Sequence, residues 1–578
     1  MQLTLESRLQ RFLAREEEDE RRTHREAQAQ PVDVRVMEGL CIRHARYVGQ
    51  RGNQYVFEVE EDSSKFRAGD PVSVGDGDGS GDAMPLAYVA YDANQRQLRL
   101  ERDPYQQRAP VDLVPGREYC IDKRALNLQD RLRGVVSEAL GTPHVAALFE
   151  ASSDTAGAGF DAARHERALQ ALANRGLNEQ QVAAGARAIA TDSLYLVQGP
   201  PGTGKTRLLA EVVRALCERP IRVVLCAFTH RAVDNALLAI RRAHPTMAIT
   251  KVGSSRDSDA ELRSASIAIT DAKDKDLPKF GVVAGTCYQL AKMGENEKFH
   301  YAIFDEAGQL PMPHAFPAML RARRWLFFGD HKQLPPVVTG HHEDREASGS
   351  VFEYLHERHG SHLLDVTYRM NAGVCGLVSD AFYGGRLHPD PSVAARAMPF
   401  VPGGRHDELL DPAHPVAWLR IDHHQPGQRS TEEAHAVGDV VEDLVRQHGI
   451  PPEQVAVIAP FRAQGRLVRS ALQRKQLTGG ERVLVDTVER IQGQEREVVV
   501  LTLATGDPLA LTRSEFFLSA NRVNVAISRA RSKVVMVASP HAFTALPMDV
   551  DALRTASLLR RLRDRMHVVD ATRLYCGG

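Results

Sequence analysis

Gly199-Pro200-Pro201-Gly202-Thr203-Gly204-Lys205-Thr206 follows the apolar run Leu194-Tyr195-Leu196-Val197 and precedes a series of helix-forming residues. Glycines at these spacings let backbone N–H groups close around phosphates, and the N-terminus of the following helix favours anions. Lys205 can reach the outer phosphates, and Thr206 can offer its hydroxyl to Mg2+. A turn that only connects a strand to a helix would explain the glycines but not Lys205 and Thr206. The octapeptide therefore predicts a site for a nucleoside triphosphate.

Composition is typical of a globular protein with several domains. The chain has 578 residues, of which 43% are hydrophobic and 25% charged, and this length predicts roughly four compact units. Residues 1–22 mix leucine with many charges, so we expect no signal peptide, no membrane span and a cytoplasmic location. Seven cysteines without a Cys-x-x-Cys pair argue against a zinc ribbon or a disulfide framework. The net charge of -1 neither indicates nor excludes a nucleic-acid partner.

The residues before the phosphate loop predict three smaller units. An apolar helical face begins the chain and is followed by a run of charges, which indicates a solvated helix. Short runs of alternating polarity then predict a small antiparallel barrel, and an Ala/Leu-rich helical pattern leads into the loop. The expected units are an N-terminal helix at 1–30, a β-barrel accessory domain at 31–124 and a helical arm at 125–176.

Two patterns resemble metal sites without completing one. The loop Asp76–Asp82 is rich in Asp and Gly, but Ala87 stands at the twelfth position, where a calcium loop needs Glu. The pairs His341-His342 and His423-His424 lack further ligands at a suitable spacing in the sequence. We therefore expect neither calcium nor zinc.

After the phosphate loop, short apolar runs alternate with helical stretches in two series, which predicts two parallel sheets covered on both faces. The first series includes Ile221–Leu225, Ile303–Phe304 and Trp325–Phe328, and the second includes Val455–Ile458, Val498–Leu501 and Val534–Val537. The boundary is expected in the polar stretch 340–349. This division gives an ATP-binding α/β domain at 177–345 and a second α/β domain at 346–578.

Asp305 and Glu306 directly follow a buried-strand candidate, at the end where parallel sheets place their chemistry. Asp305 can hold Mg2+ while Glu306 activates water, and cationic contacts to the γ-phosphate would complete such a site. Two acids that cap the next helix would be the alternative. A second signature, Gly329-Asp330-His331-Lys332-Gln333-Leu334-Pro335-Pro336, again follows an apolar strand. As a whole it resembles motif III of superfamily 1 helicases, and its Leu-Pro-Pro ending is similar to the up-frameshift and senataxin-like branch of superfamily 1B.

The resemblance extends from about Leu177 to Ala538 and implies two tandem RecA-like P-loop domains. By likeness, Leu177–Gln181 is a Q motif whose glutamine, Gln181, reads the adenine edge. The segment Ala227–Asn235 resembles motif Ia and Gly285–Cys287 the element after it, and both contact the nucleic-acid backbone in this family. Phosphate contacts of that kind carry no sequence information.

The second domain resembles the family with some departures. Tyr368-Arg369-Met370 is similar to motif IV, but Thr367 stands where Gln is common and Asn371-Ala372 where His-Pro is common. Thr487–Glu495 resembles motif V, with Glu489 and Ile491 in place of the usual Asp and Phe. Asn521–Arg531 resembles motif VI, whose central arginine is Arg529. The likeness implies that Arg369 and Arg529 contact phosphate and that Glu495 faces the ribose.

The implied protein is an ATP- and Mg2+-dependent helicase or translocase that moves 5'-to-3' on single-stranded nucleic acid, with DNA favoured over RNA and the barrel lying over the strand. An RNA helicase, a remodeller that does not separate strands and a non-catalytic scaffold are the alternatives. The expected catalytic residues are Lys205, Asp305, Glu306, Gln333, Arg369 and Arg529, with Thr206 and Asp305 on the metal. The expected nucleotide contacts are Gln181, Gly199, Pro200, Pro201, Gly202, Thr203, Gly204, Lys205, Thr206, Tyr368 and Glu495. The expected nucleic-acid contacts are Thr229, His230, Arg231, Thr286, Pro460, Phe461 and Thr487.

Overall fold

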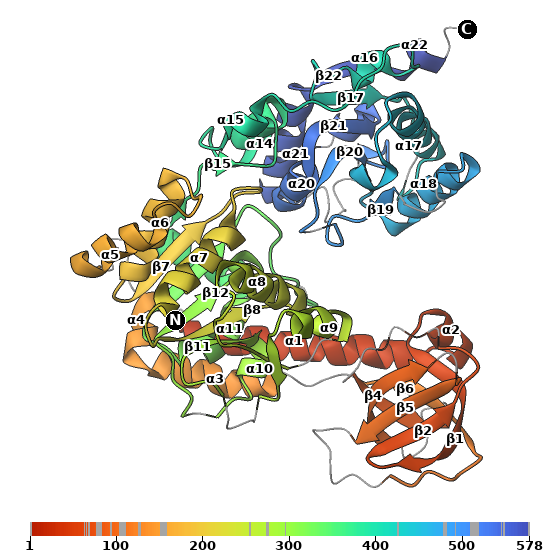
Figure 1. The fold of residues 1–578 in the computed structure, drawn as a ribbon. Helices are drawn as coiled ribbons and strands as arrows, with labels where there is room; N and C mark the ends of the chain where they lie inside the picture. The colour runs from red at the N-terminus through yellow and green to blue at the C-terminus, as the bar shows by residue number, and fades with distance from the viewer. Residues whose placement is uncertain are drawn as a thin grey trace.

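Two parallel sheets and one closed antiparallel barrel form the framework of the computed structural model (Figure 1). This architecture agrees with the fold class expected from the sequence. None of the helices in the described part of the chain has the length and apolar character of a membrane span. The structure describes residues 3–575 except 63, 65, 67–69, 77–83, 93–94, 103–110, 125–128, 151–158, 254–255, 273–276, 295, 341, 425–426, 478–482, 492, 509–518, 545 and 547–549.

The barrel closes in the strand order β1-β2-β5-β4-β3-β6, so its strands have paired neighbours on both sides. Its interior is filled by apolar side chains such as Phe57, Leu98 and Ile121, which are fully buried. Most of the loop compared with a calcium site lies outside the described residues. The same holds for His341, the first member of one of the two histidine pairs considered for zinc. The barrel strands are β1 (Cys41–Arg51), β2 (Gln54–Glu58), β3 (Pro71–Gly75), β4 (Met84–Asp92), β5 (Gln97–Arg102) and β6 (Glu118–Lys123).

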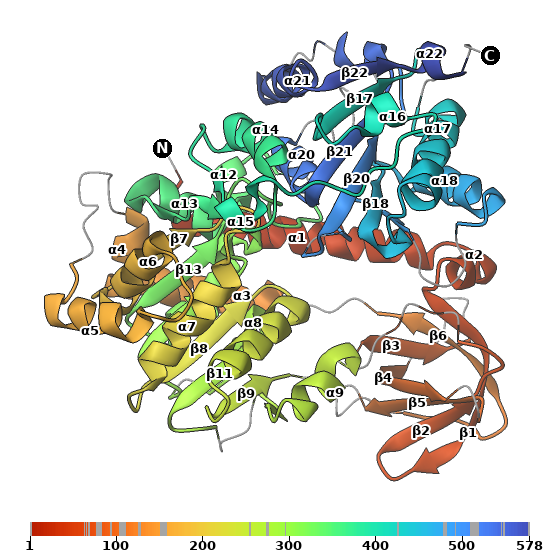
Figure 2. The ribbon, with the colours of Figure 1, turned by 45° about the horizontal axis from the view of Figure 1, so that its top comes forward.

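The N-terminal helix α1 (Leu5–Gln28) extends from the first parallel-sheet domain to the barrel, where α2 (Val32–Met37) follows it (Figure 2). Our expectation that this segment is a solvated helix is wrong for its first half. Leu9, Phe12 and Leu13 are buried in the same core as the helices under the first sheet. The apolar face of α1 therefore serves as a packing surface.

Glu16 on α1 fastens this helix to the segment that follows motif III. Its carboxylate accepts hydrogen bonds from the backbone N–H groups of Thr339 (2.9 Å) and Gly340 (2.9 Å) and contacts Nε2 of His342 at 2.6 Å. About two turns earlier on α1, Arg8 pairs with Asp344 at 2.6 Å. These contacts attach the arm of the barrel to the first parallel-sheet domain.

The first parallel sheet has eight strands in the order β10-β9-β11-β8-β12-β13-β7-β14. Its strands are β7 (Leu194–Gln198), β8 (Arg222–Ala227), β9 (Ile249–Val252), β10 (Ala268–Thr270), β11 (Gly281–Thr286), β12 (Tyr301–Phe304), β13 (Trp325–Gly329) and β14 (His362–Leu363). Around it lie α3 (Gln129–Gly141), α4 (Pro143–Glu150), α5 (Ala162–Leu172), α6 (Glu179–Ala190), α7 (Lys205–Cys217), α8 (His230–Ala243), α9 (Arg256–Ser264), α10 (Cys287–Leu290), α11 (Met312–Met319), α12 (Arg345–Ser348) and α13 (Val351–His359).

The passage to the second domain comes later than the polar stretch 340–349. Helix α13 contributes Val351, Phe352 and Leu355 to the core of the first domain, and β14 pairs with β7 at the edge of the first sheet. The chain therefore leaves the first domain only after Leu364, whose N–H still donates to Gln198. Glycines and polar residues at 340–349 mark a loop inside the first domain.

The second parallel sheet has six strands in the order β19-β18-β20-β21-β17-β22, and β15 pairs with β16 beside it. The strands are β15 (Val366–Thr367), β16 (His388–Pro389), β17 (Val416–Arg420), β18 (Val455–Ile458), β19 (Leu484–Asp486), β20 (Arg496–Thr502), β21 (Ala530–Ala538) and β22 (His567–Asp570). The helices are α14 (Ala372–Phe382), α15 (Pro391–Ala394), α16 (Asp407–Leu410), α17 (Thr431–Glu442), α18 (Arg462–Arg474), α20 (Ala520–Ile527), α21 (Val550–Arg563) and α22 (Ala571–Tyr575).

Candidate nucleotide site between the two domains

The phosphate loop joins β7 to α7 and touches both domains. Gly202 and Gly204 have φ angles of 77° and 75°, in the left-handed region that favours glycine. The carbonyl of Gly202 accepts from the N–H of Tyr368 at 2.8 Å. A Cβ atom at Gly202 would lie 2.5 Å from Cβ of Arg369 and 2.5 Å from Oγ1 of Thr367. The second domain therefore approaches the loop so closely that only glycine fits.

Three ionisable groups of the first domain meet directly behind this loop. Nζ of Lys205 lies 2.9 Å from Oε1 of Glu306 and 3.7 Å from Oδ1 of Asp305. Burial raises the pKa of Asp305 to about 6, against the opposing effect of Lys205. Burial alone would lower the pKa of Lys205, but Glu306 and Asp305 outweigh it and the pKa is raised. The expected catalytic trio is thus one connected cluster.

Thr206 and Asp305 provide the oxygen donors that a magnesium ion would need. Thr206 stands in the first turn of α7, and the carboxylate of Asp305 is buried at the end of β12. Mg2+ prefers oxygen ligands and is bound in nucleotide sites by one or two protein groups together with the phosphates. The two residues therefore fit the ion that the sequence predicts.

Asp330 of motif III is the centre of a buried hydrogen-bond network. Its carboxylate accepts from Gln198 Nε2 (3.0 Å), Gln333 Nε2 (2.9 Å) and the hydroxyl of Tyr383 (2.7 Å). Gln333 also donates to the carbonyl of Gly199 at 3.3 Å, so its amide is directed at the phosphate loop. Tyr383 belongs to the second domain, and the network therefore crosses the interface.

Two asparagines of motif VI form further hydrogen bonds across the interface between the two domains. Asn524 donates to Lys332 O at 2.7 Å and to the hydroxyl of Tyr383 at 2.9 Å, and Asn521 donates to His331 O at 2.9 Å. The prediction from sequence gives no role to the side chains of Asp330, Tyr383 and Asn524. Asp330 and Asn524 lie within motifs III and VI, and this membership is the signal that the sequence offers for them.

Arg369 and Arg529 approach the site from the second domain. Arg369 donates to Glu495 at 2.6 Å and to Ser528 O at 3.0 Å, and burial lowers its pKa although Glu495 opposes this. Arg529 is only 3% exposed and donates to Val525 O at 3.1 Å. Burial and the nearby cation of Arg369 lower the pKa of Arg529 to about 9, and Glu306 of the first domain acts in the opposite direction. Glu306 of the Lys205 cluster therefore acts on Arg529, whereas the hydrogen bonds of Arg369 lie within the second domain.

The structure gives three of the expected nucleotide contacts other partners. Gln181 is buried, donates to Thr203 O at 2.9 Å and accepts from the N–H of Asn178 at 3.0 Å. Glu495 pairs with Arg369 and Arg531, and these cations lower its pKa although burial opposes them. Tyr368 is 38% exposed and accepts from Asn178 at 2.8 Å. Gln181 thus supports the phosphate loop, and its contact with adenine stays a prediction.

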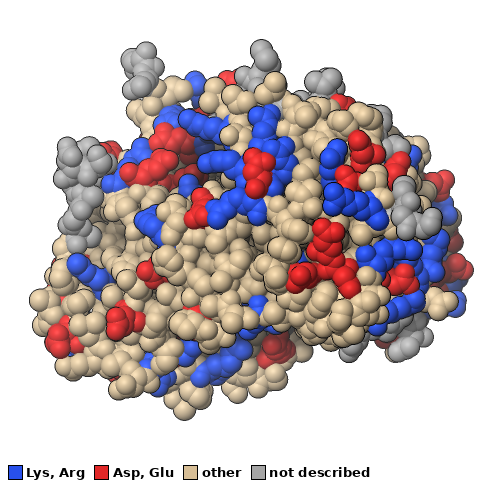
Figure 3. Space-filling view, turned by 90° about the horizontal axis from the view of Figure 1, so that it is seen from above, with Lys and Arg blue, Asp and Glu red and all other residues tan. Residues whose placement is uncertain are grey.

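The expected nucleic-acid contacts follow the carboxyl ends of strands in both sheets. Thr229 and Thr286 come at the ends of β8 and β11, and Phe461 and Thr487 follow β18 and β19. Thr229 and Arg231 are exposed, whereas Thr286 is buried and only 5% exposed. In the view from above, basic and acidic side chains are interspersed, so charge alone does not trace a path for a strand (Figure 3). These contacts stay predictions.

A phosphate loop, two acids at a neighbouring strand end and two arginines from a second parallel-sheet domain are the parts expected of an ATP-hydrolysing enzyme, and the matching family models and curated relatives support a helicase of superfamily 1. Residues 176–280 and 272–340 match a family model described as an AAA domain, and residues 347–541 match a second model with the same description. The finer assignment to the up-frameshift and senataxin-like branch rests on the motifs alone.

Curated relatives share this region. The chain is 28% identical over 437 residues to the DNA replication ATP-dependent helicase/nuclease DNA2 of Mus musculus, covering 68% of this chain and 40% of that protein. The corresponding protein of Schizosaccharomyces pombe is 27% identical over 397 residues, covering 63% and 28%. The chain thus spans 40% or less of the length of these relatives. The solved complex of arterivirus nonstructural protein 10 (helicase) with DNA is 16% identical, with a TM-score of 0.36 and coverage of 88% and 80%.

Proposed function

We propose that this ATPase is a motor that moves along single-stranded nucleic acid, with DNA as the preferred strand and 5'-to-3' as the direction. One observation carries the proposal: the catalytic groups are divided between two domains, with Lys205 and Glu306 on one side and Arg369 and Arg529 on the other. A site divided in this way works only when the domains close around the triphosphate.

The contacts of Lys205 suggest how nucleotide binding prepares the reaction. Lys205 pairs with Glu306 at 2.9 Å, which occupies both the phosphate-binding cation and the acid that would orient water. A triphosphate in the loop attracts Lys205 and leaves Glu306 to position the attacking water. Mg2+ held by Thr206 and Asp305 would supply charge neutralisation at the phosphates.

Closure of the two domains then brings Arg369 and Arg529 to the bound triphosphate. Arg369 and Arg529 stabilise the charge that develops on the transferred phosphoryl group, a contribution of about 10^3 to 10^5 in rate for arginines of this kind. After hydrolysis the domains separate, and the strand contacts at the carboxyl ends of the two sheets move relative to each other. DNA is preferred because the relatives above carry DNA replication in their names. Direction and branch rest on the motif resemblance.

Lys205→Ala tests the motor. The variant should lose strand-stimulated ATP hydrolysis and the displacement of a strand from a tailed duplex. Arg207→Ala is the matched control, because Arg207 is an exposed cation in the same turn of α7 and donates to Arg175 O at 3.0 Å. Full activity of Lys205→Ala would refute the assignment. Stimulation by single-stranded DNA and RNA of equal length at equal salt concentration tests the preferred strand, because these affinities depend strongly on salt.

A further inference from the structure

Three potential metal ligands meet at the carboxyl edge of the second sheet, away from the nucleotide site. Asp422 and His424 follow β17, and His541 lies in the short helix Pro540–Thr544 after β21. Their ligand atoms lie within 4.8 Å of one another. Oδ1 of Asp422 is 2.9 Å from Nε2 of His541, and the rings of His424 and His541 stack with centroids 3.9 Å apart.

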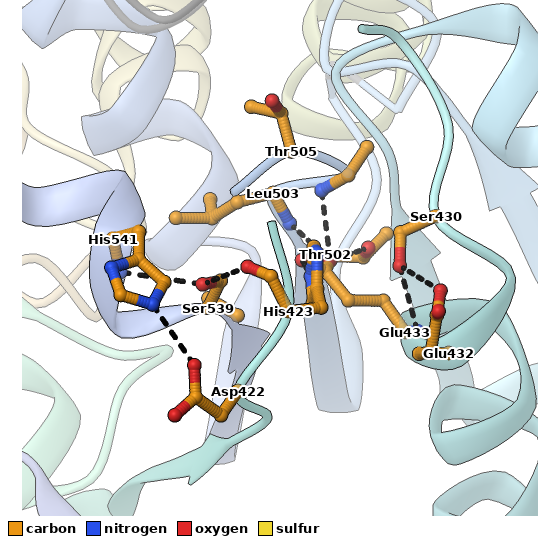
Figure 4. A network of polar contacts seen from close by, with 12 residues as sticks. Asp422, His423, Ser430, Glu432, Glu433, Thr502, Leu503, Thr505, Ser539 and His541 are labelled. Atoms are coloured by element: carbon orange, nitrogen blue, oxygen red, sulfur yellow. Dashed lines mark hydrogen bonds and ion pairs between the residues drawn. The ribbon is translucent and has the colours of Figure 1, made fainter. Parts of the chain in front are cut away.

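The residue between the first two ligands fixes their direction. His423 points into the domain, where its Nε2 contacts Oε1 of the fully buried Glu433 at 2.9 Å (Figure 4). Successive side chains of an extended segment point to opposite sides. Asp422 and His424 are accordingly exposed while His423 is 7% exposed. The inward contact of His423 therefore directs its two neighbours outward on the same side.

Glu433, the hydrogen-bond partner of His423, is itself held by several hydrogen bonds. The second carboxylate oxygen of Glu433 accepts from the hydroxyl of Thr502 and from the N–H groups of Leu503 (3.0 Å) and Ala504 (2.8 Å). A charge-assisted network of this kind, buried and fully paired, holds its members in one geometry.

A second set of bonds holds the third ligand against the first two. Ser539 donates to the carbonyl of His423 at 2.8 Å, and the N–H of His541 donates to the hydroxyl of Ser539 at 3.3 Å (Figure 4). The backbone that carries His541 is thereby joined to the backbone that carries Asp422 and His424. Supporting hydrogen bonds behind metal ligands orient them and typically account for 10- to 100-fold in metal affinity.

We propose that Asp422, His424 and His541 bind a divalent transition-metal ion, with Zn2+ as the preferred ion and water as the fourth ligand. Two imidazoles and one carboxylate are a ligand set typical of zinc, at about 2.0–2.2 Å from the ion. Side chains 57% exposed at Asp422 and 32% at His541 leave the ion a route from solvent and the freedom to adjust. The sequence pattern does not indicate this site, because His541 is remote from the His423-His424 pair along the chain.

Zinc titration of the tag-free full chain, stripped with a chelator and kept in Mg2+, tests the site by calorimetry. One Zn2+ per chain should bind. Asp422→Asn, His424→Ala and His541→Ala should each weaken binding by at least about tenfold. His435→Ala is the control, because His435 is an exposed histidine on α17 of the same domain.

Two results would overturn the proposal. The first is zinc binding that is equally strong in all three ligand variants, which would assign it to scattered surface histidines. The second is no zinc binding by the wild-type chain. Circular dichroism of each variant excludes unfolding, and Co2+ bound by the wild-type chain should give visible absorption that the His541→Ala chain lacks. Lys205→Ala should bind zinc normally, which separates this site from the motor.

Discussion

The hydroxyl of Tyr383, at the end of α14 in the second domain, donates a 2.7 Å hydrogen bond to Asp330 at the end of β13 in the first. Both side chains are buried, and Asn524 donates to the same hydroxyl at 2.9 Å. Asp330 also accepts from Gln333, whose amide contacts the phosphate loop. A change in the loop can thus reach the second domain through three side chains.

Tyr383→Phe should slow ATP turnover without weakening ATP binding in proportion. The substitution keeps the ring but removes a donor to a buried carboxylate, a loss of about 1–3 kcal/mol in the closed arrangement. We expect strand-stimulated kcat to fall about tenfold, with the KM for ATP changed much less. Tyr354→Phe is the control, because that hydroxyl donates to Phe149 O at 3.0 Å within the first domain. An equal loss of kcat in both variants would contradict a role across the interface.

Arg529→Ala should leave nucleotide affinity nearly intact and stop turnover. The guanidinium lies beside Arg369 and within the electrostatic influence of Glu306, so its charge acts on the transferred phosphoryl group more than on the bound ground state. Steady-state ATPase rates should fall by about 10^3-fold or more. Equilibrium binding of a fluorescent ATP analogue should change little. Matching losses in affinity and rate would argue against this role.

Lys533 makes the stability of the chain depend on pH in the alkaline range. Burial lowers the pKa of Lys533 to about 7, although its ammonium group donates to Asp411 O (3.0 Å) and His414 O (2.6 Å). Between this pKa and the ordinary value of 10.5 the unfolded chain binds the proton and the folded chain does not. The free energy of unfolding therefore rises with pH between about 7 and 10.5, and this gain is absent below pH 7, where both states bind the proton.

Urea unfolding of the wild-type chain and Lys533→Met at pH 7, 8.5 and 10 measures this effect. Subtraction of the two curves cancels the titration of the other lysines and tyrosines. The wild type should gain stability relative to Lys533→Met as pH rises. A constant difference across the three pH values would show that Lys533 titrates as an ordinary lysine.

Glu16→Gln should loosen the attachment of the barrel arm. An amide group presents N–H donors to the N–H groups of Thr339 and Gly340, so at least one of the present hydrogen bonds is lost. Hydrogen exchange of these two amides should become faster, and the free energy of unfolding should fall by about 1–3 kcal/mol. Glu26→Gln is the control, because Glu26 on the same helix is 71% exposed. Unchanged exchange at Thr339 and Gly340 would contradict the attachment.

The sequence predicted most of the framework because local patterns determine it. The phosphate loop, the acids after β12 and the two series of buried strands are each encoded within a few residues. The position where the chain leaves the first domain could not be read in this way, since β14 has only two residues and its place depends on pairing with β7. The same holds for Tyr383 and Asp330, whose contact joins positions in different domains.

The burial of α1 is a second feature that could not be predicted from the sequence. The sequence predicts an apolar helical face at the start of the chain, but the surface that covers Leu9, Phe12 and Leu13 of this face comes from remote parts of the chain. The charges from Arg15 onward suggested solvent around the whole helix. Several of them, including Glu16 and Asp19, are in fact buried. Residue type alone does not separate a solvated charge from a paired one.

The contact of Glu16 with Thr339 and Gly340 has a mechanical consequence. Because it couples the arm to the first domain, the barrel would move with that domain in the motor we propose. The separation between the barrel and the second sheet would then change once per ATP consumed in the proposed motor. A nucleic-acid strand lying between these two parts would contact the barrel, which is fixed to the first domain, and the second sheet, which moves relative to it.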